Sequence, residues 1–331
     1  MEKIYPNLIK NDKKDLETFL LNNDLIYEDN IESTFVKRQN GQIIGTGSRH
    51  QNIIKCLAID DNYKGSSLIN EIITILINEI YNEGYDNIFL YTKPIYQETF
   101  ARFGFNIIEE VKDKLIFMER SNNFSKYLEF LENQKVDYLN IGSIIMNANP
   151  FTLGHRYLVE YGAKNCDYLY IFLVSEDLST FSTKERLYLV KEGCKDIKNL
   201  KILPTYKYLI SSATFPSYFI KKKDELTEIQ ARLDCAIFKN HIGKALNINK
   251  RFVGDEKQDQ VTDIYNKIMK EELTNKPNPI EIIEVPRLTV DGKPISASIV
   301  RSLISKNDFK NLEKYLPPTS FSYILKKYKD K

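Results

Sequence analysis

Short apolar runs of strand type alternate with helical stripes along this chain. Ile53–Ile59 (IIKCLAI) is apolar and rich in β-branched residues, and Asn87–Thr92 (NIFLYT) is a second run of this kind. Between them, Ser66–Tyr81 carries apolar residues at the three- and four-residue spacing of an amphipathic helix. We therefore expect a β-loop-α-β block within the first 120 residues.

The same alternation continues through the second half of the chain. Ser182 and Glu185 form the S-x-x-E pattern of a helix capping box. Alternation of this kind predicts a mostly parallel sheet wrapped by helices, with a ligand crevice beyond the carboxyl ends of the strands. The expected strands are Leu139–Met146, Tyr168–Val174, Lys201–Leu203, Arg251–Val253 and Ile280–Val285, and the expected helices are Gly154–Lys164, Ser182–Cys194, Glu225–Ala245 and Ala297–Ser305.

The length of the chain favours two domains. Single cores rarely grow past about 250 residues, and this chain has 331. Phe124–Val136 has a helical stripe that ends in the polar residues Asn133–Lys135. We expect an amino-terminal domain over 1–123, a connecting helix over 124–136 and a carboxy-terminal domain over 137–331.

Composition excludes several classes of partner. The chain has 47 basic and 45 acidic residues, and a net charge of +2 provides no global field for nucleic acid or an anionic membrane. No uncharged apolar run reaches the roughly 18 residues of a membrane span, and the amino terminus lacks the apolar core of a signal peptide. The four cysteines lie far apart with no C-x-x-C pair, as free thiols of a reducing compartment do. We expect a cytoplasmic protein with no nucleic-acid or membrane partner.

A candidate anion site follows the first strand of the carboxy-terminal half. Met146–Arg156 reads MNANPFTLGHR, in which Thr152, Gly154 and His155 form a T-x-G-H pattern. Gly154 would let the backbone approach a phosphate, and the first N–H groups of a helix attract anions. His155 can donate a hydrogen bond to a phosphate oxygen, although the pattern alone also fits a structural histidine.

A second candidate opens the helix near the end of the chain. Ile295–Arg301 reads ISASIVR, in which Ser296 or Ser298 can cap the helix. Arg301 would lie on the first turns, where it could contact a triphosphate through two N–H groups. Alone, this pattern also fits an ordinary capped helix.

Together, the two patterns resemble the HIGH-type nucleotidylyltransferase superfamily. FSTKER (Phe181–Arg186) resembles the segment before that superfamily's second helix, and VGDE (Val253–Glu256) resembles its glycine-containing phosphate loop. With ISSATFPSYFIKK (Ile210–Lys222), these motifs are similar to the citrate lyase ligase family over essentially the whole chain. The resemblance implies an α/β protein whose carboxy-terminal domain has a Rossmann-like parallel sheet.

The amino-terminal half resembles the GNAT acetyltransferases. The matching strings are CLAIDDNYKGSSLINEII and the later YQETFARFGF. The resemblance implies a GNAT-like α+β domain in which the loop of Lys64, Gly65, Ser66 and Ser67 binds the phosphates of a coenzyme-A-derived arm. Ser67 stands where the GNAT pattern has its second glycine. A second interpretation is therefore kept, in which the domain has the GNAT fold but no longer binds a cofactor.

The family resemblance implies a two-step reaction. Acetate and ATP would give acetyl-adenylate and pyrophosphate, and the thiol of the coenzyme-A-derived prosthetic group on the citrate lyase acyl carrier subunit would then take the acetyl group. Mg²⁺ would accompany ATP, with no protein side chain expected as a metal ligand. The implied catalytic residues are His155, Thr152 and Arg301, and the implied ATP-binding residues are Asn147, Ala148, Asn149, Pro150, Phe151, Thr152, Gly154, His155, Gly254, Glu256, Ser296, Ser298 and Arg301.

Two other functions stay open at this point. One is an adenylyltransferase that acts on a small phosphorylated substrate, and the other is a non-catalytic assembly factor for citrate lyase. Thr152 stands where the superfamily often has histidine. No cysteine–histidine pairing is evident in the sequence, so we expect direct transfer from the adenylate rather than a covalent acyl-enzyme.

Overall fold

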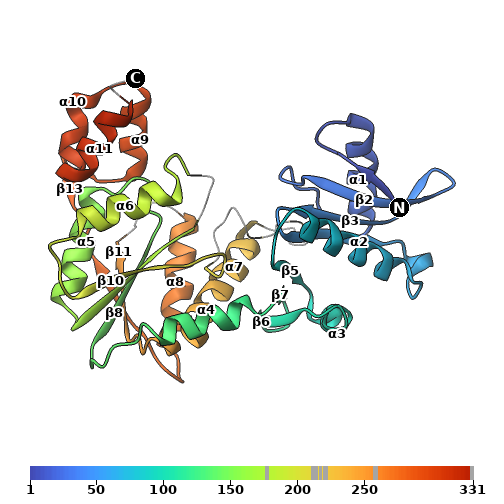
Figure 1. Cartoon of the computed structure of the whole chain (residues 1–331), viewed down its shortest axis with the longest axis horizontal. Helices are drawn as coiled ribbons and strands as arrows, with labels where there is room; N and C mark the ends of the chain where they lie inside the picture. The colour runs from blue at the N-terminus through green and yellow to red at the C-terminus, as the bar shows by residue number, and fades with distance from the viewer. Residues whose placement is uncertain (176–178, 210–214, 216–217, 219–222, 256–259, 329–331) are drawn as a thin grey trace. The chain divides into compact units, whose positions relative to one another are not determined.

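The computed structural model describes residues 1–175, 179–209, 215, 218, 223–255 and 260–328. The chain packs as two units, of which unit 1 is Met1–Tyr127 with Thr214–Leu233, and unit 2 is Leu128–Ala213 with Asp234–Lys331. Two helices, α4 (Asn123–Glu132) and α7 (Lys223–Ile237), begin in unit 1 and end in unit 2 (Figure 1). The expected division into domains at residues 123 and 137 stays a prediction.

Unit 1 is built on a seven-stranded sheet in the order β1-β2-β3-β4-β5-β7-β6, in the described part of the chain. All neighbouring strands are antiparallel except β4 and β5. The expectation of a mostly parallel sheet is therefore wrong for this unit, whereas the expected α+β class is observed. The strands are β1 (Glu2–Ile4), β2 (Ser33–Gln39), β3 (Gln42–His50), β4 (Ile53–Ile59), β5 (Ile88–Thr92), β6 (Asn106–Val111) and β7 (Leu115–Arg120). The helices are α1 (Lys10–Asn22), α2 (Leu68–Asn82) and α3 (Gln97–Ala101), with 3-10 turns η1 (Asp61–Tyr63) and η2 (Pro94–Tyr96).

Strand β3 lacks the apolar alternation of a typical strand because α2 packs directly on its backbone. A Cβ atom on Gly47 would lie 2.5 Å from a methyl group of Ile72, and one on Gly45 would lie 2.8 Å from Leu68. Larger side chains at these two positions would push the helix off the sheet. Close packing thus places glycine where sequence patterns expect an apolar residue.

Strands β4 and β5 pair over two residues only and then diverge. The Phe89 N–H group donates to the Asn52 carbonyl at 2.9 Å, and the Tyr91 carbonyl, two residues on, is directed to the same side. That carbonyl accepts a hydrogen bond from the Tyr218 hydroxyl at 3.0 Å instead of from β4. Tyr218 is buried in one cluster with Cys56 of β4. Tyr218 therefore contributes to the core of unit 1, and most of the motif Ile210–Lys222 lies outside the described residues.

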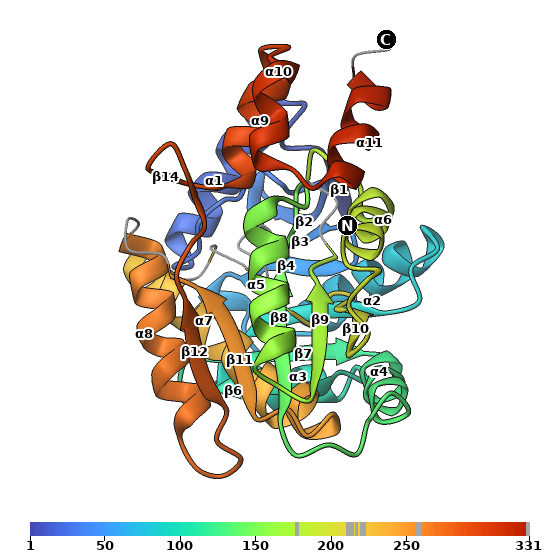
Figure 2. The same ribbon diagram turned by 90° about the vertical axis from the view of Figure 1, so that its left-hand side faces the viewer.

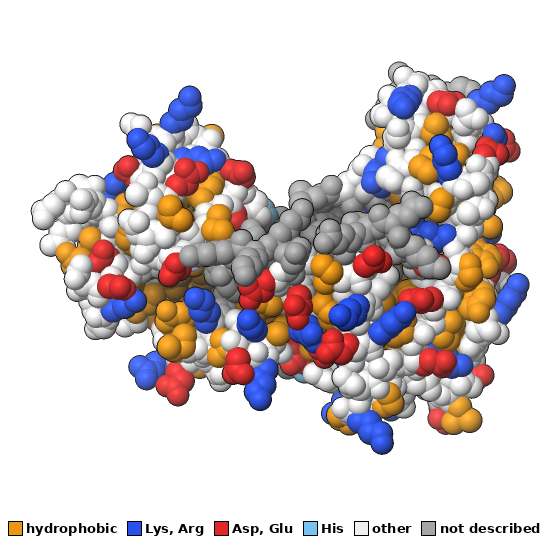
Figure 3. Space-filling model, turned by 180° about the vertical axis from the view of Figure 1, so that it is seen from behind, with side chains coloured by type: hydrophobic (Ala, Val, Ile, Leu, Met, Phe, Trp, Pro, Cys, Tyr) orange, Lys and Arg blue, Asp and Glu red, His pale blue; other side chains and the backbone are white. Residues whose placement is uncertain are grey.

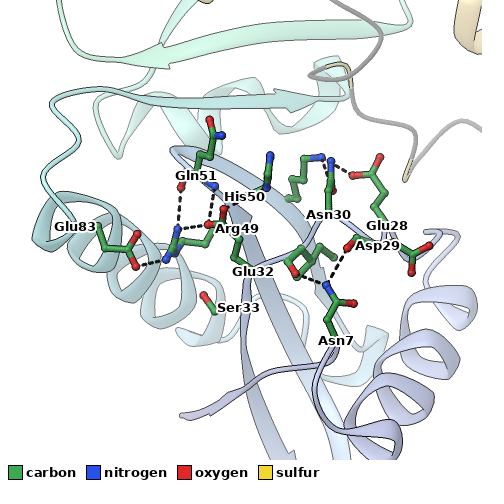
Figure 4. A network of polar contacts seen from close by, with 12 residues as sticks. Asn7, Glu28, Asp29, Asn30, Glu32, Ser33, Arg49, His50, Gln51 and Glu83 are labelled. Carbon is green, nitrogen blue, oxygen red and sulfur yellow. Dashed lines mark hydrogen bonds and ion pairs between the residues drawn. The ribbon is translucent and has the colours of Figure 1, made fainter. Parts of the chain in front are cut away.

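Ion pairs of the buried Arg49 hold α2 against the sheet of unit 1. Arg49 of β3 is 4% exposed and contacts Glu79 of α2 at 2.9 Å and Glu32 at 2.7 Å. Its guanidinium also pairs with Glu83 at the end of α2 (Figure 4). Removing one member of such a network leaves buried charge uncompensated. The network therefore fixes the axis of the helix that begins after the loop 64–67.

Unit 2 contains a five-stranded sheet in the order β10-β9-β8-β11-β12, and all its neighbouring strands are parallel. The expected Rossmann-like sheet is therefore observed. Its strands are β8 (Ile141–Met146), β9 (Tyr168–Leu173), β10 (Leu200–Pro204), β11 (Lys250–Gly254) and β12 (Glu281–Val285), with a small hairpin of β13 (Thr289–Val290) and β14 (Lys293–Pro294). Besides α4 and α7, the helices are α5 (Leu153–Lys164), α6 (Thr183–Gly193), the π-helix η3 (Phe238–Gly243), α8 (Gln260–Thr274), α9 (Ala297–Ser305), α10 (Phe309–Leu312), the 3-10 turn η4 (Glu313–Tyr315) and α11 (Pro318–Tyr328).

The chain order places a crevice at the carboxyl ends of β8 and β11. Strand β8 is the first of this sheet in the chain and lies between β9 and β11. The chain adds β9 and β10 on one side of β8 and then β11 and β12 on the other, so the strand order reverses at β8. Figure 2 shows α5 across one face of the sheet and α9 beyond its carboxyl edge. Ile144, Val159, Phe252 and Val300 belong to one core cluster, which fixes α5 and α9 relative to the strands.

The surface carries charges of both signs. Lys and Arg side chains are interspersed with Asp and Glu on the face in Figure 3. In the described residues, no helix has the length and apolar character to cross a membrane.

Candidate active site

The first helix of unit 2 begins with a capping box made by Thr152 and His155. The Thr152 hydroxyl accepts a hydrogen bond from the His155 N–H group at 3.3 Å, and His155 Nδ1 accepts one from the Thr152 N–H group at 3.1 Å. The N–H groups of Thr152 and His155, which would otherwise lack acceptors at the start of a helix, thus each have a side-chain partner. They also fix the imidazole at the end of β8.

His155 is neutral at physiological pH. Burial lowers the pKa of its imidazole to about 4, and the positive charge of Arg287 contributes in the same direction. Because Nδ1 accepts a hydrogen bond, the proton of the neutral ring lies on Nε2. The ring stacks on Phe151 with 5.9 Å between centroids. His155 therefore offers the cavity an oriented, uncharged N–H donor.

Helix α9 contributes a second capped N-terminus. The Ser296 hydroxyl accepts a hydrogen bond from the Ile299 N–H group at 3.4 Å, and the hydroxyls of Ser296 and Ser298 lie 2.8 Å apart. Arg301 donates through Nη1 to the Asn149 carbonyl at 2.6 Å. This bond joins α9 to the loop that precedes α5, so the two sequence motifs meet in the structure.

One cavity of about 490 Å³ collects the N-termini of α5 and α9 and the carboxyl ends of β8 and β11. Two helix N-termini and an arginine at one cavity favour a polyanionic ligand. Of the expected residues, the cavity is lined by Asn147, Thr152, Gly154, His155, Gly254, Ser296, Ser298 and Arg301.

Four expected ATP-binding residues do not line this cavity. Ala148 and Phe151 are buried in the core cluster, and Phe151 packs so closely on Gly193 that a Cβ there would lie 2.5 Å from its ring. Pro150 is buried, and Asn149 contributes its carbonyl to Arg301. These four residues fix the conformation of the loop after β8 and do not form the wall of the cavity. Glu256 lies outside the described residues.

Arg186 of α6 was not expected to support the site, yet it holds the loop after β8. It is fully buried and donates through Nη1 to the Asn147 carbonyl at 2.8 Å and to the Val174 carbonyl at 2.7 Å. The two carbonyls follow β8 and β9, so one guanidinium joins the ends of neighbouring strands. The motif FSTKER and its capping serine indicate that Arg186 lies on the first turns of a helix. They do not indicate that its side chain is buried, because that depends on the packing of the fold.

Arg287 is a second residue missing from the expectations. It follows β12 and lines the cavity beside Gly254, where an added Cβ would lie 3.8 Å from its Nε. The carboxyl ends of parallel strands share one edge, so the position after Val285 could have been included from the strand pattern alone.

The loop 64–67 of unit 1 lies directly before α2. Gly65 has φ +85°, and a Cβ there would meet no atom within 4 Å. The Ser66 hydroxyl accepts a hydrogen bond from the Leu68 N–H group at 3.3 Å, and Ser67 is the N-cap without a side-chain cap bond. The exposed Lys64 forms an ion pair with Asp61, which raises the pKa of its ammonium. The loop thus places a cation at a helix start, while the N–H groups of Lys64 and Ser66 donate to the carbonyls of Asp61 and Tyr63 at 3.3 and 3.2 Å.

Comparisons with known proteins match most of the chain to one family. The family model "Citrate lyase ligase C-terminal domain" matches residues 141–324. The citrate (pro-3S)-lyase ligase of Haemophilus influenzae is 39% identical over 318 residues, which cover 94% of each chain. The enzyme of that name from Escherichia coli is 38% identical over 94% of this chain and 89% of its own. A solved acetyltransferase of the GNAT family from Staphylococcus aureus is 17% identical over 36% of this chain and 97% of its own, with a TM-score of 0.30. On the family model and these relatives, the chain belongs to the citrate lyase ligase family.

Proposed function

We propose that this ligase activates acetate with ATP and acetylates the thiol of the coenzyme-A-derived arm on the citrate lyase acyl carrier subunit. In the first step, an acetate oxygen bonds to the α-phosphorus, the bond to the β-phosphate oxygen breaks, and pyrophosphate leaves. In the second step, the thiol sulfur bonds to the acetyl carbon, AMP leaves, and the thiol proton passes to solvent.

The observation that carries this proposal is the convergence of both motifs on one cavity. Thr152, Gly154 and His155 meet Ser296, Ser298 and Arg301 there, although about 140 residues separate them in the sequence. The cavity combines backbone N–H groups, a neutral donor and a cation, as a nucleoside triphosphate requires. In a member of the citrate lyase ligase family, this arrangement favours acid activation over the two alternatives.

The first step needs positioning and charge stabilisation more than covalent work by the protein. His155 would donate Nε2–H to the α-phosphate, where negative charge crowds as the acetate oxygen approaches. Thr152 contacts the Nδ1 atom of the same ring through its N–H group and its hydroxyl. The direction of the Nε2–H donor is therefore fixed before ATP binds. Gly154 carries no side chain on the cavity wall, which allows a phosphate to lie close to the backbone.

The leaving pyrophosphate would lie at the N-terminus of α9. Arg301 and the hydroxyls of Ser296 and Ser298 line this side of the cavity. Mg²⁺ would enter with the nucleotide and neutralise phosphate charge, since it usually binds phosphates and retains several waters. In the described part of the chain, no group of three or more His, Cys, Asp or Glu side chains is placed to hold a metal ion.

The acetyl group would pass directly from the adenylate to the arm. Burial raises the pKa of the Cys166 thiol to about 11 and that of Cys194 to about 12, which disfavours the nucleophilic thiolate. The other two cysteines, Cys56 and Cys235, are buried, and the described residues that line the cavity include none of the four. Free cysteines also agree with a reducing cytoplasm, where we place the reaction.

The loop 64–67 would bind the phosphate of the arm in unit 1. Its glycine at positive φ, its exposed lysine and the N-terminus of the 15-residue helix α2 support this assignment. Lys64→Glu should therefore weaken carrier acetylation and leave adenylate formation nearly unchanged. The matched control is Lys112→Glu, a charge reversal at an exposed residue between β6 and β7. Equal acetylation rates in the two variants would remove the loop from the arm site.

Product analysis tests the function as a whole. The purified protein with ATP, acetate and the thiol-bearing carrier should yield AMP, pyrophosphate and acetylated carrier. An adenylyltransferase would instead require a phosphorylated substrate and retain AMP in its product. A protein that assists citrate lyase without turning over ATP would establish the non-catalytic alternative.

A further inference from the structure

Arg287, which follows β12, lines the cavity together with Arg301. We propose that these two guanidiniums together hold the pyrophosphate part of ATP, one from the chain after β12 and one from α9. The inference rests on the proposed function, because it adds a phosphate-binding residue to the same nucleotide site. It also gives the chain after β12 a direct role in binding the group that leaves.

The sheet places Arg287 beside the loop that follows β11. The Asp255 N–H group donates to the Val285 carbonyl at 2.9 Å, so the ends of β11 and β12 lie side by side. An added Cβ on Gly254 would lie 3.8 Å from Arg287 Nε and 4.0 Å from its Cγ. The side chain of Arg287 thus lies against the bare backbone at Gly254, and the two line one wall of the cavity.

A triphosphate bound in the cavity would need a second positively charged side chain. A triphosphate carries several negative charges, whereas His155 is neutral at physiological pH and supplies only a donor. Among the described residues that line the cavity, Arg287 and Arg301 are the side chains that stay positively charged. Arg301 alone would therefore leave most of the phosphate charge without a protein cation.

The two arginines approach from different elements. Arg301 extends from α9, and one of its Nη atoms is committed to the Asn149 carbonyl. Arg287 extends from the chain after β12, on the side of Gly254. A planar guanidinium can bind two phosphate oxygens at once, and two such groups orient a pyrophosphate more firmly than one.

The charge of Arg287 also acts on His155. It lowers the pKa of the imidazole, in the same direction as burial does. Arg287 would therefore keep His155 an uncharged donor while it binds phosphate itself. The His155 pKa in a variant without this charge therefore tests whether Arg287 lies close to His155.

Isothermal calorimetry with pyrophosphate and with AMP tests the assignment in the full chain without acetate. Arg287→Gln should weaken pyrophosphate binding roughly 10- to 100-fold, as expected for loss of a charged hydrogen bond, and change AMP binding less than about twofold. Arg301→Gln should behave similarly. The control is Lys306→Gln, which removes an exposed charge at the far end of α9 and should leave both affinities unchanged.

Unchanged pyrophosphate binding in Arg287→Gln would overturn the inference, as would an equal loss of AMP binding. A second readout is the His155 pKa measured by NMR, which should rise in Arg287→Gln and stay constant in Lys306→Gln. If the unmodified protein bound neither pyrophosphate nor ATP, the proposed function would fail as well. If it bound both and Arg287→Gln left pyrophosphate affinity unchanged, the proposed function would stand and this inference would be wrong.

Discussion

The Nδ1 atom of His155 accepts a hydrogen bond from the Thr152 N–H group at 3.1 Å. This bond determines which ring nitrogen carries the proton, because a neutral imidazole has one donor and one acceptor. The threonine therefore acts on the chemistry through the histidine, as the residue that orients the donor. The same bond explains how one short motif can cap a helix and prepare a phosphate site.

Replacing His155 with alanine should lower turnover roughly 100-fold, while ATP affinity changes little, since the donor acts mainly on charge that develops in the transition state. It should also destabilise the fold by about 1 kcal/mol, because half of the capping box is lost. Steady-state kinetics, ATP titration and urea unfolding measure the three quantities. His241→Asn, on η3 and outside the cavity lining, is the control. An equal loss in ATP affinity would assign His155 to ground-state binding.

The imidazole of His155 should titrate near pH 4 in the NMR spectrum. The folded pKa lies below the usual unfolded value of about 6.5, so the unfolded chain binds more protons between these values. The contribution of His155 to stability is therefore complete above about pH 6.5 and is lost as the pH falls toward 4. His155→Gln should flatten this part of the stability profile. A midpoint near pH 6.5 would show that the ring is neither buried nor beside a cation.

Gly154→Ala should affect ATP binding much more than it affects the stability of the fold. The three atoms nearest to an added Cβ all belong to Ile295, at an ordinary contact distance of 3.5 Å, so stability should change by less than about 1 kcal/mol. The methyl group would, however, occupy the wall that a phosphate approaches, and ATP binding should fall about tenfold or more. Gly162→Ala, on the same helix and outside the cavity lining, should keep full ATP binding. Similar ATP affinity in the two variants would contradict the phosphate assignment.

Arg186→Met should destabilise the protein by about 3 kcal/mol. It removes the donors to the part-buried carbonyls of Asn147 and Val174, which would be left without their charged partner. Chemical denaturation measures the effect, and Lys184→Met, at an exposed position two residues away, should change stability by less than about 0.5 kcal/mol. Since Arg186 holds Asn147, the KM for ATP should rise as well. Equal stability of the two variants would show that Arg186 does not hold the ends of β8 and β9.

Local patterns predicted the strands of the unit 2 parallel sheet and several of its helices, whereas α8, α10 and α11 were not among the expected helices. The run after Leu139 and the T-x-G-H pattern predict a strand, a loop and a helix, which are β8, the loop 147–152 and α5. The S-x-x-E pattern at Ser182 is a complete capping box in the structure. These features depend on neighbouring residues, so one sequence contains the information that they need.

Features that depend on distant packing were missed. The glycines of β3 follow from its contact with α2, and the burial of Arg186 follows from two strand ends that meet only in the fold. The contact of Tyr218 with Tyr91 joins residues 127 positions apart, so no local pattern indicates that Tyr218 packs in unit 1. Arg287 lies before a small hairpin without a motif, and only the parallel order of the sheet brings it to the cavity.

Exchange of labelled pyrophosphate into ATP tests the central claim most directly. The reaction reports reversible adenylate formation and needs no carrier, so it isolates the cavity of unit 2 in the intact chain. We predict exchange that depends strictly on acetate, falls roughly 100-fold in His155→Ala and persists in Lys64→Glu. Absence of exchange with acetate, or exchange at the same rate without it, would contradict the assignment of this cavity to acid activation.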